Sequence, residues 1–96
     1  MNVIIGGEKM PIISQFYGII ISMYFDDNNQ HNLPHIHVRY NEFKAAYDFE
    51  TNLLSGNLPV KQTKLVEAWI IIHKEDLKTL WNVMEEEGRI FKIKPL

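Results

Sequence analysis

The sequence predicts an α+β domain, with an antiparallel sheet of three to five strands packed on one side by C-terminal helices. Two observations support this fold class. Several segments before Pro59 are β-branched and aromatic or alternate polar and apolar residues, whereas apolar residues after Pro59 recur at helical spacing. A run of strands followed by a run of helices is typical of α+β folds.

The first expected strand covers residues 17–25, with the sequence YGIIISMYF. Its β-branched and aromatic residues follow one another with almost no polar alternation, which is typical of a strand covered on both faces. The next segment, 26–34, is dense in Asp, Asn and Pro and is expected to form a loop.

Residues 35–40 and 43–49 are expected to form a β-hairpin. Both segments alternate polar and apolar side chains, and alternation places every second residue on the same face of a strand. Residues 41–42 (Asn-Glu) are the predicted tight turn, because Asn tolerates positive φ. A further turn at 51–52 is expected to lead into a short strand at 53–55.

A two-residue turn determines the register of this hairpin and the composition of its two faces. It places His35 opposite Asp48 and His37 opposite Ala46, with opposed Cβ atoms about 4.5–5.5 Å apart. The polar face is then expected to carry His35, His37, Arg39, Lys44 and Asp48. The apolar face is expected to carry Ile36, Val38, Ala45, Tyr47 and Phe49.

Two helices are expected after Pro59, a residue typical of helix starts. The first helix is expected to bury a row of Leu65, Trp69 and Ile72 beside a row of Val66, Ile70 and His73. A second helix, or a bent extension of the first, is predicted over 75–87 and ends at Gly88. The tail 90–96 (IFKIKPL) is expected to supply a final short strand.

Composition limits the classes of function. The 96 residues are 46% apolar and 23% charged, as in an ordinary globular domain. No segment approaches the ~20 apolar residues of a membrane span, and the lack of cysteine excludes disulfides and thiolate metal sites. We therefore expect a cytoplasmic protein that does not enter membranes. Its net charge of -2 argues against non-specific binding to phosphate backbones.

Three interpretations of the histidine-rich segment HNLPHIHVRY remain open. The first is a structural surface, since a polar sheet face tolerates histidine. The second is a zinc site with His31, His35 and His37 as ligands. The third is acid–base chemistry by His35 and His37, in which Asp48 orients His35 and Arg39 binds a phosphate or carboxylate.

Five segments carry a family resemblance: FYGIIISMYF, PHIHV, GNLP, LVEAW and KIKPL. With them the chain resembles, over residues 10–96, a family of short bacterial proteins catalogued as domain of unknown function 4160. Residues 10–96 are then expected to form a single α+β domain, and residues 1–9 an N-terminal extension or the product of an upstream start. The family's segment DH-x-PPHFHV matches at His31, His35 and His37, while the loop before it is longer and Leu33 stands where the family has its first proline.

The resemblance implies no established biochemical activity. It implies a small protein partner, because members of the family are often encoded beside another small protein, as in toxin–antitoxin or mobile-element modules. We predict a partner-binding component of such a module, whose edge strand at 53–55 could also support a homo-oligomer. The alternative prediction is a histidine-dependent phosphodiesterase or ribonuclease, with or without an assisting metal ion. Nucleic acid is expected as a partner only in that case.

Overall fold

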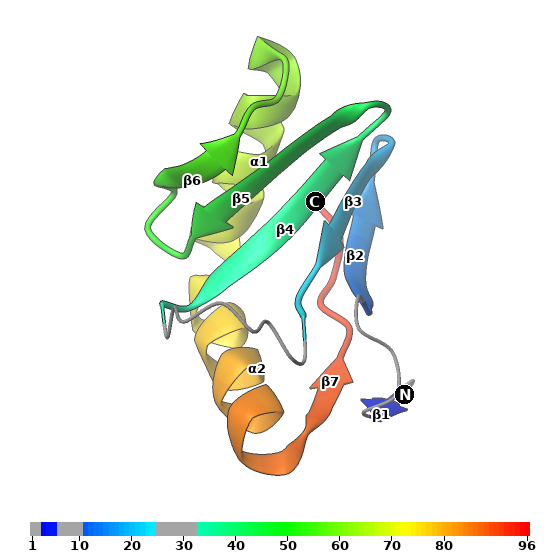
Figure 1. The fold of residues 1–96 in the computed structure, drawn as a ribbon, viewed down its shortest axis with the longest axis vertical. Coiled ribbons are helices and arrows are strands. Elements are labelled where there is room, and N and C mark those ends of the chain that lie inside the picture. The colour runs from blue at the N-terminus through cyan, green and yellow to red at the C-terminus, as the bar shows by residue number, and fades with distance from the viewer. Residues whose placement is uncertain (1–2, 6–10, 25–32) are drawn as a thin grey trace.

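The computed structural model describes residues 3–5, 11–24 and 33–96. Five strands form one antiparallel sheet in the order β2-β3-β4-β5-β6, and two helices follow it in the chain (Figure 1), which confirms the α+β prediction. The strands of this sheet are β2 (Ile12–Phe16), β3 (Ile19–Ser22), β4 (His35–Tyr40), β5 (Phe43–Asp48) and β6 (Leu53–Gly56).

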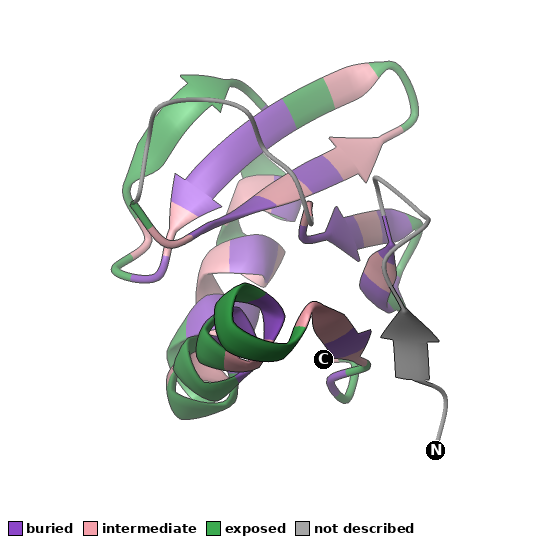
Figure 2. Cartoon of the chain, turned by 60° about the horizontal axis from the view of Figure 1, so that its bottom comes forward, coloured by how far each residue is buried: buried purple, intermediate pink, exposed green. Residues whose placement is uncertain are grey.

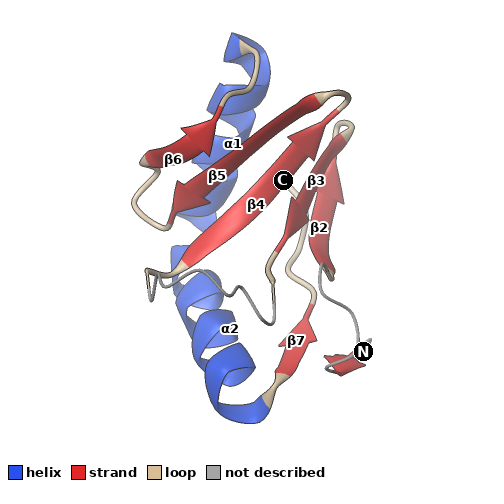
Figure 3. Cartoon of the chain, viewed as in Figure 1, coloured by secondary structure: helices blue, strands red, loops and turns tan. Residues whose placement is uncertain are grey.

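The helices are α1 (Val60–Ile72) and α2 (Lys74–Glu87), which meet at His73. This arrangement confirms the two helices expected after Pro59 and the end of the second at Gly88. A separate two-stranded sheet pairs β1 (Val3–Ile5) with β7 (Arg89–Phe91), as Figure 3 shows in red. The expected C-terminal strand is therefore present as β7. None of the described helices is long and apolar enough to cross a membrane.

The core lies between the helices and one face of the sheet. Every member of the expected apolar face of the hairpin is buried and belongs to this core. The helices contribute Val66, Trp69, Ile70, Leu77, Leu80, Trp81 and Met84 to it. Ile72 was expected on this buried row, but it is 64% exposed because the inward face of α1 runs through Val66, Trp69 and Ile70. Figure 2 shows the outer surfaces of both helices in green.

The strand expected over 17–25 is present in a shorter form, as β3 at Ile19–Ser22. Its predicted start is wrong, because Tyr17 and Gly18 form the turn that joins β3 to β2, a strand that was not predicted. Both turn residues have positive φ, at 51° and 79°, which suits the two-residue turns that connect antiparallel strands. Tyr17 is consequently 70% exposed, whereas a strand covered on both faces would bury it.

The second hairpin was predicted correctly in turn and register. Asn41 adopts a φ of 52° in the turn, and the pairing places His35 opposite Asp48 and His37 opposite Ala46. Of the loop expected at 26–34, all but its last two residues lie outside the described residues. In the strand order of the sheet, the histidine-bearing strand β4 lies in the middle, between β3 and β5.

Candidate functional site

The predicted polar residues lie together on the face of the hairpin opposite to its apolar core residues. His35, His37 and Arg39 alternate along β4, while Lys44 and Asp48 alternate along β5. The register sets Arg39 opposite Lys44 and His35 opposite Asp48. We call this surface, with its described neighbours on β3, the histidine face. Sequence pattern alone was enough to bring these five residues together.

His35 is buried, although we expected it on an open surface. Only 7% of the residue is exposed, because the Trp81 ring of α2 lies 5.5 Å from the imidazole, centroid to centroid. Its Nδ1 lies 2.7 Å from the backbone oxygen of Leu33. Since a carbonyl oxygen can only accept, Nδ1 donates this hydrogen bond. In the neutral imidazole Nε2 is then the nitrogen that can accept a hydrogen bond or bind a metal ion. The contacts thus fix the orientation of this imidazole.

His37 is held by an aromatic stack. Its ring lies 3.9 Å from the Tyr24 ring, with 19° between the two planes. The His35 ring approaches it edge-on, at a centroid distance of 5.0 Å. Aromatic pairs in these arrangements contribute about 0.5–1.5 kcal/mol beyond the area they bury. Both histidines are therefore placed by ring contacts, as a preorganised site requires.

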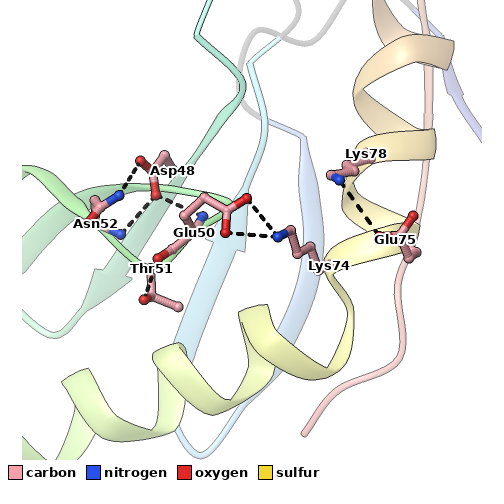
Figure 4. A network of polar contacts seen from close by, with 7 residues as sticks. All are labelled: Asp48, Glu50, Thr51, Asn52, Lys74, Glu75 and Lys78. Atoms are coloured by element: carbon pink, nitrogen blue, oxygen red, sulfur yellow. Dashed lines mark hydrogen bonds and ion pairs between the residues drawn. The ribbon is translucent and has the colours of Figure 1, made fainter.

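The Asp48 carboxylate accepts its hydrogen bonds from the loop between β5 and β6. One oxygen accepts hydrogen bonds from the backbone N–H groups of Glu50 and Asn52, at 2.9 and 2.8 Å, and the other accepts from the Asn52 side-chain amide at 2.9 Å (Figure 4). Burial raises the pKa of Asp48, but these hydrogen bonds together outweigh it and lower the pKa below its ordinary value of 3.8. The carboxylate therefore shapes the loop, and the Leu33 carbonyl is the group that orients His35.

A small cavity of about 70 Å³ opens on the histidine face. Its polar wall comes from three adjacent strands and one flanking residue: Ser22 from β3, Tyr24 two residues after the end of β3, His37 and Arg39 from β4, and Lys44 from β5. Ser22 lies opposite His37 in the register. The cavity thus combines two cations with hydroxyl and imidazole groups.

The zinc hypothesis depends on a residue outside the described part of the chain. His31 belongs to that part, so the structure places only His35 and His37 of the three predicted ligands. Within the described ranges, no three His, Asp or Glu side chains gather closely enough to hold a metal ion. The Nδ1 bond from His35 to a backbone carbonyl is the contact that metal-binding histidines usually make through their second nitrogen. Zinc binding stays a prediction.

Ser22 and Tyr24 were missed as site residues. The error follows from treating 17–25 as one strand, because the correct start of β3 at Ile19 makes the alternation from Ile20 to Tyr24 visible. Ile20 is paired with Arg39, and Ser22 with His37, so these β3 residues share the face of the histidines. The Tyr-Gly pair at 17–18 was the signal that could have placed the turn.

The two edges of the sheet offer a second candidate site. At the β2 edge, the Ile93 N–H donates a 2.8 Å hydrogen bond to the Ile13 carbonyl, and the Trp69 indole donates to the Lys94 carbonyl at 2.8 Å. The C-terminal tail is thereby held against β2. At the other edge, all four residues of β6 are exposed, and β5 is its only strand neighbour among the described residues.

Comparison with known proteins gives one match. The family model described as "Domain of unknown function (DUF4160)" matches residues 18–82, which is more than half of the chain. That range contains both histidines of the described site, all of β6 and all of α1. The closing KIKPL segment of the predicted resemblance lies beyond it. No curated protein and no solved structure matches the chain.

Proposed function

Since the chain belongs to the family described as domain of unknown function 4160, we propose from its geometry that it is a cytoplasmic partner-binding component of a toxin–antitoxin-like or mobile-element module. The partner is a small protein, and it docks along β6. The open, uncharged edge of the sheet is the observation that carries this proposal.

The edge at β6 lacks the charged residues and prolines that often prevent strand pairing, while its pairing with β5 has an irregular register at Ala46 and Tyr47. Its sequence, LLSG, contains no charged residue and no proline, whereas natural edge strands are usually protected by such residues, by bulges or by a covering segment. Leu53 is 50% and Leu54 43% exposed, so both faces of the strand present apolar surface. Figure 2 draws β6 in green, the colour of exposed residues. An edge of this kind favours the addition of another strand.

The occupant that fits this edge is an extended segment of the partner. Such a segment would form main-chain hydrogen bonds with the outer side of β6 and would place apolar side chains beside Leu53 and Leu54. The loop that leads into β6 is already ordered by Asp48 and by an ion pair between Glu50 and Lys74 of α2 at 2.7 Å (Figure 4). The edge therefore needs little rearrangement before it binds.

The test is co-purification of the chain with the small protein encoded beside it, followed by titration calorimetry of the complex. We expect Leu54→Lys to weaken binding at least tenfold, because a charge at the edge opposes strand addition. Val60→Lys is the matched control, since Val60 is 74% exposed on α1 and the substitution adds the same charge. Sedimentation of the isolated chain decides whether a second copy can occupy the same edge.

Wild-type affinity in Leu54→Lys, or an equal loss in Val60→Lys, would rule out docking at β6. We also expect His35→Ala and His37→Ala to leave the complex intact, because both residues lie on the histidine face rather than at the edge. A dimer of the isolated chain that Leu54→Lys abolishes would replace the proposed partner with a second copy.

The enzymatic alternative stays a prediction with weaker geometric support. Its expected orienting residue, Asp48, has both carboxylate oxygens engaged by Glu50 and Asn52. The histidine pair and Arg39 nevertheless lie on one face, as a phosphodiesterase would need. A bell-shaped pH–rate profile that disappears in His37→Ala would establish this activity.

A further inference from the structure

The cavity on the histidine face has a charge arrangement that the fold itself does not require. Arg39 and Lys44 are directly opposite each other on neighbouring strands and share its wall. Directly opposed like charges destabilise a sheet. Among the described residues neither cation forms an ion pair, although Lys74, Lys78 and Arg89 all do. The pair is therefore better explained by an anion that binds between the two side chains.

The remaining walls of the cavity suit the same ligand. Ser22 and Tyr24 bring hydroxyl groups and His37 brings an imidazole that Tyr24 holds in place. None of the described residues that line the cavity is acidic. Among the described residues, a bound anion would thus meet cations and hydrogen-bond donors from three strands and no carboxylate.

Size and donor number distinguish between classes of anion. The cavity measures about 70 Å³, which is small beside the roughly 300–1,000 Å³ of pockets that enclose drug-sized ligands. Its size therefore suits one compact group rather than a whole larger ligand. A carboxylate can be satisfied by one bidentate arginine, whereas a phosphoryl group presents three oxygens and up to two negative charges. The two cations and the additional donors correspond to the phosphoryl group.

We propose that this cavity is a binding site for a single phosphoryl group, held by Arg39 and Lys44 with His37 and Ser22 as further donors. The planar guanidinium of Arg39 binds two oxygens in parallel, and the ammonium of Lys44 supplies a second point charge. The site is separate from the partner edge at β6, so either proposal can fail without the other. The negative net charge of the chain favours a terminal phosphate over the continuous backbone of a nucleic acid.

The first experiment titrates the protein with inorganic phosphate, using calorimetry and thermal melting at an ionic strength held constant with sodium chloride. We expect saturable binding and a rise in Tm with phosphate concentration. Arg39→Gln and Lys44→Gln are each expected to weaken binding at least tenfold. Lys92→Gln is the matched control, because it removes the same charge from an exposed position on the C-terminal tail.

Melting without phosphate separates a ligand site from a structural role. If the two cations oppose each other in the free protein, Lys44→Gln will melt at or above the parent temperature. A lower Tm in that variant would show that Lys44 supports the fold and would contradict the proposal. The proposal is also overturned if phosphate gives no effect beyond sodium chloride, or if Lys92→Gln weakens binding as much as Arg39→Gln.

Two further ligands identify the source of the phosphoryl group. A short oligonucleotide with a 5′-phosphate is compared with the same oligonucleotide lacking it, each in competition with inorganic phosphate. Competition by the phosphorylated form alone supports a polynucleotide terminus as the ligand. If neither oligonucleotide competes while inorganic phosphate binds, the result supports the phosphate of a small molecule. Equal competition by both forms would contradict a site for a terminal phosphate.

Discussion

The two edges of the five-stranded sheet differ in the contacts that the rest of the chain makes with them. At β2, the C-terminal tail is tied to the Ile13 carbonyl through Ile93, and α1 secures the same tail through Trp69. At β6, four consecutive residues are exposed, and none of the described elements covers the outer side. One edge is thus held by the C-terminal tail, while the other is exposed and is covered by none of the described residues.

This difference suggests that residues at the β2 edge contribute mainly to the stability of the fold, whereas residues at the β6 edge contribute mainly to binding. Trp69 is fully buried and connects helix, tail and sheet edge, so changes near β2 should unfold the protein. Leu53 and Leu54 are half-exposed and bury little surface within the chain, so changes at β6 should affect partners more than folding.

Trp69→Ala should cause the largest loss of stability. The substitution removes a fully buried side chain and the 2.8 Å hydrogen bond to Lys94 that holds the tail at the β2 edge. Replacement of a buried tryptophan by alanine costs about 3–5 kcal/mol, measured as the free energy of unfolding in urea. Ile72→Ala, on the exposed side of the same helix, should stay within about 0.5 kcal/mol of the parent. Similar losses in both variants would contradict the assignment of Trp69 to the closed edge.

Gly56→Ala should have the next largest effect, at the end of β6. Gly56 has a φ of 72°, and an added Cβ would overlap the Lys44 carbonyl oxygen on β5. Alanine at a positive φ destabilises by more than about 1 kcal/mol, and the overlap adds to that. Gly88→Ala is the matched control, since Gly88 has a φ of 68° with open space around its Cβ position. The unfolding free energy should fall further in Gly56→Ala, and equal losses would show that the overlap relaxes freely.

Asp48→Asn should produce the smallest change, visible mainly as pH dependence. The folded pKa of Asp48 is lowered, so its contribution to stability is present above the ordinary value of 3.8 and is lost as the pH falls through the folded value. The parent should therefore lose more stability than Asp48→Asn when the pH falls from neutral to below 3.8. Urea denaturation across that range measures the difference. Glu86→Gln, an exposed change on α2, should keep the pH dependence of the parent, and a parent-like slope in Asp48→Asn would refute the effect.

The second hairpin was predictable because its determinants are local. Residues 35–40 and 43–48 alternate cleanly, and Asn41 permits the positive φ of a two-residue turn. A register shift by one residue would move every apolar side chain to the wrong face, so turn length and alternation together determined the pairing. The same logic placed His35 opposite Asp48 and His37 opposite Ala46, as the structure has them.

The first hairpin was not predicted because an apolar run carries no period. Ile19, Ile20 and Ile21 look alike in sequence, and the turn before them depends on Tyr17 adopting a φ that is uncommon for its residue type. Tertiary packing overrode the apparent continuity of the run. For the same reason, the stacking of Tyr24 on His37 was not predicted.

The sequence by itself determined the α+β class, the start of the first helix and the bounds of the second to within a residue or two, and the β4 and β5 residues of the histidine face, because periodicity and turn chemistry are local properties. Only the tertiary structure decided that Asp48 serves its loop, that Trp81 covers His35, that Tyr24 stacks on His37 and that the tail closes one edge of the sheet alone. These contacts join segments distant in the chain or choose between competing hydrogen-bond partners. Such choices depend on the packing of the whole domain, which no local pattern contains.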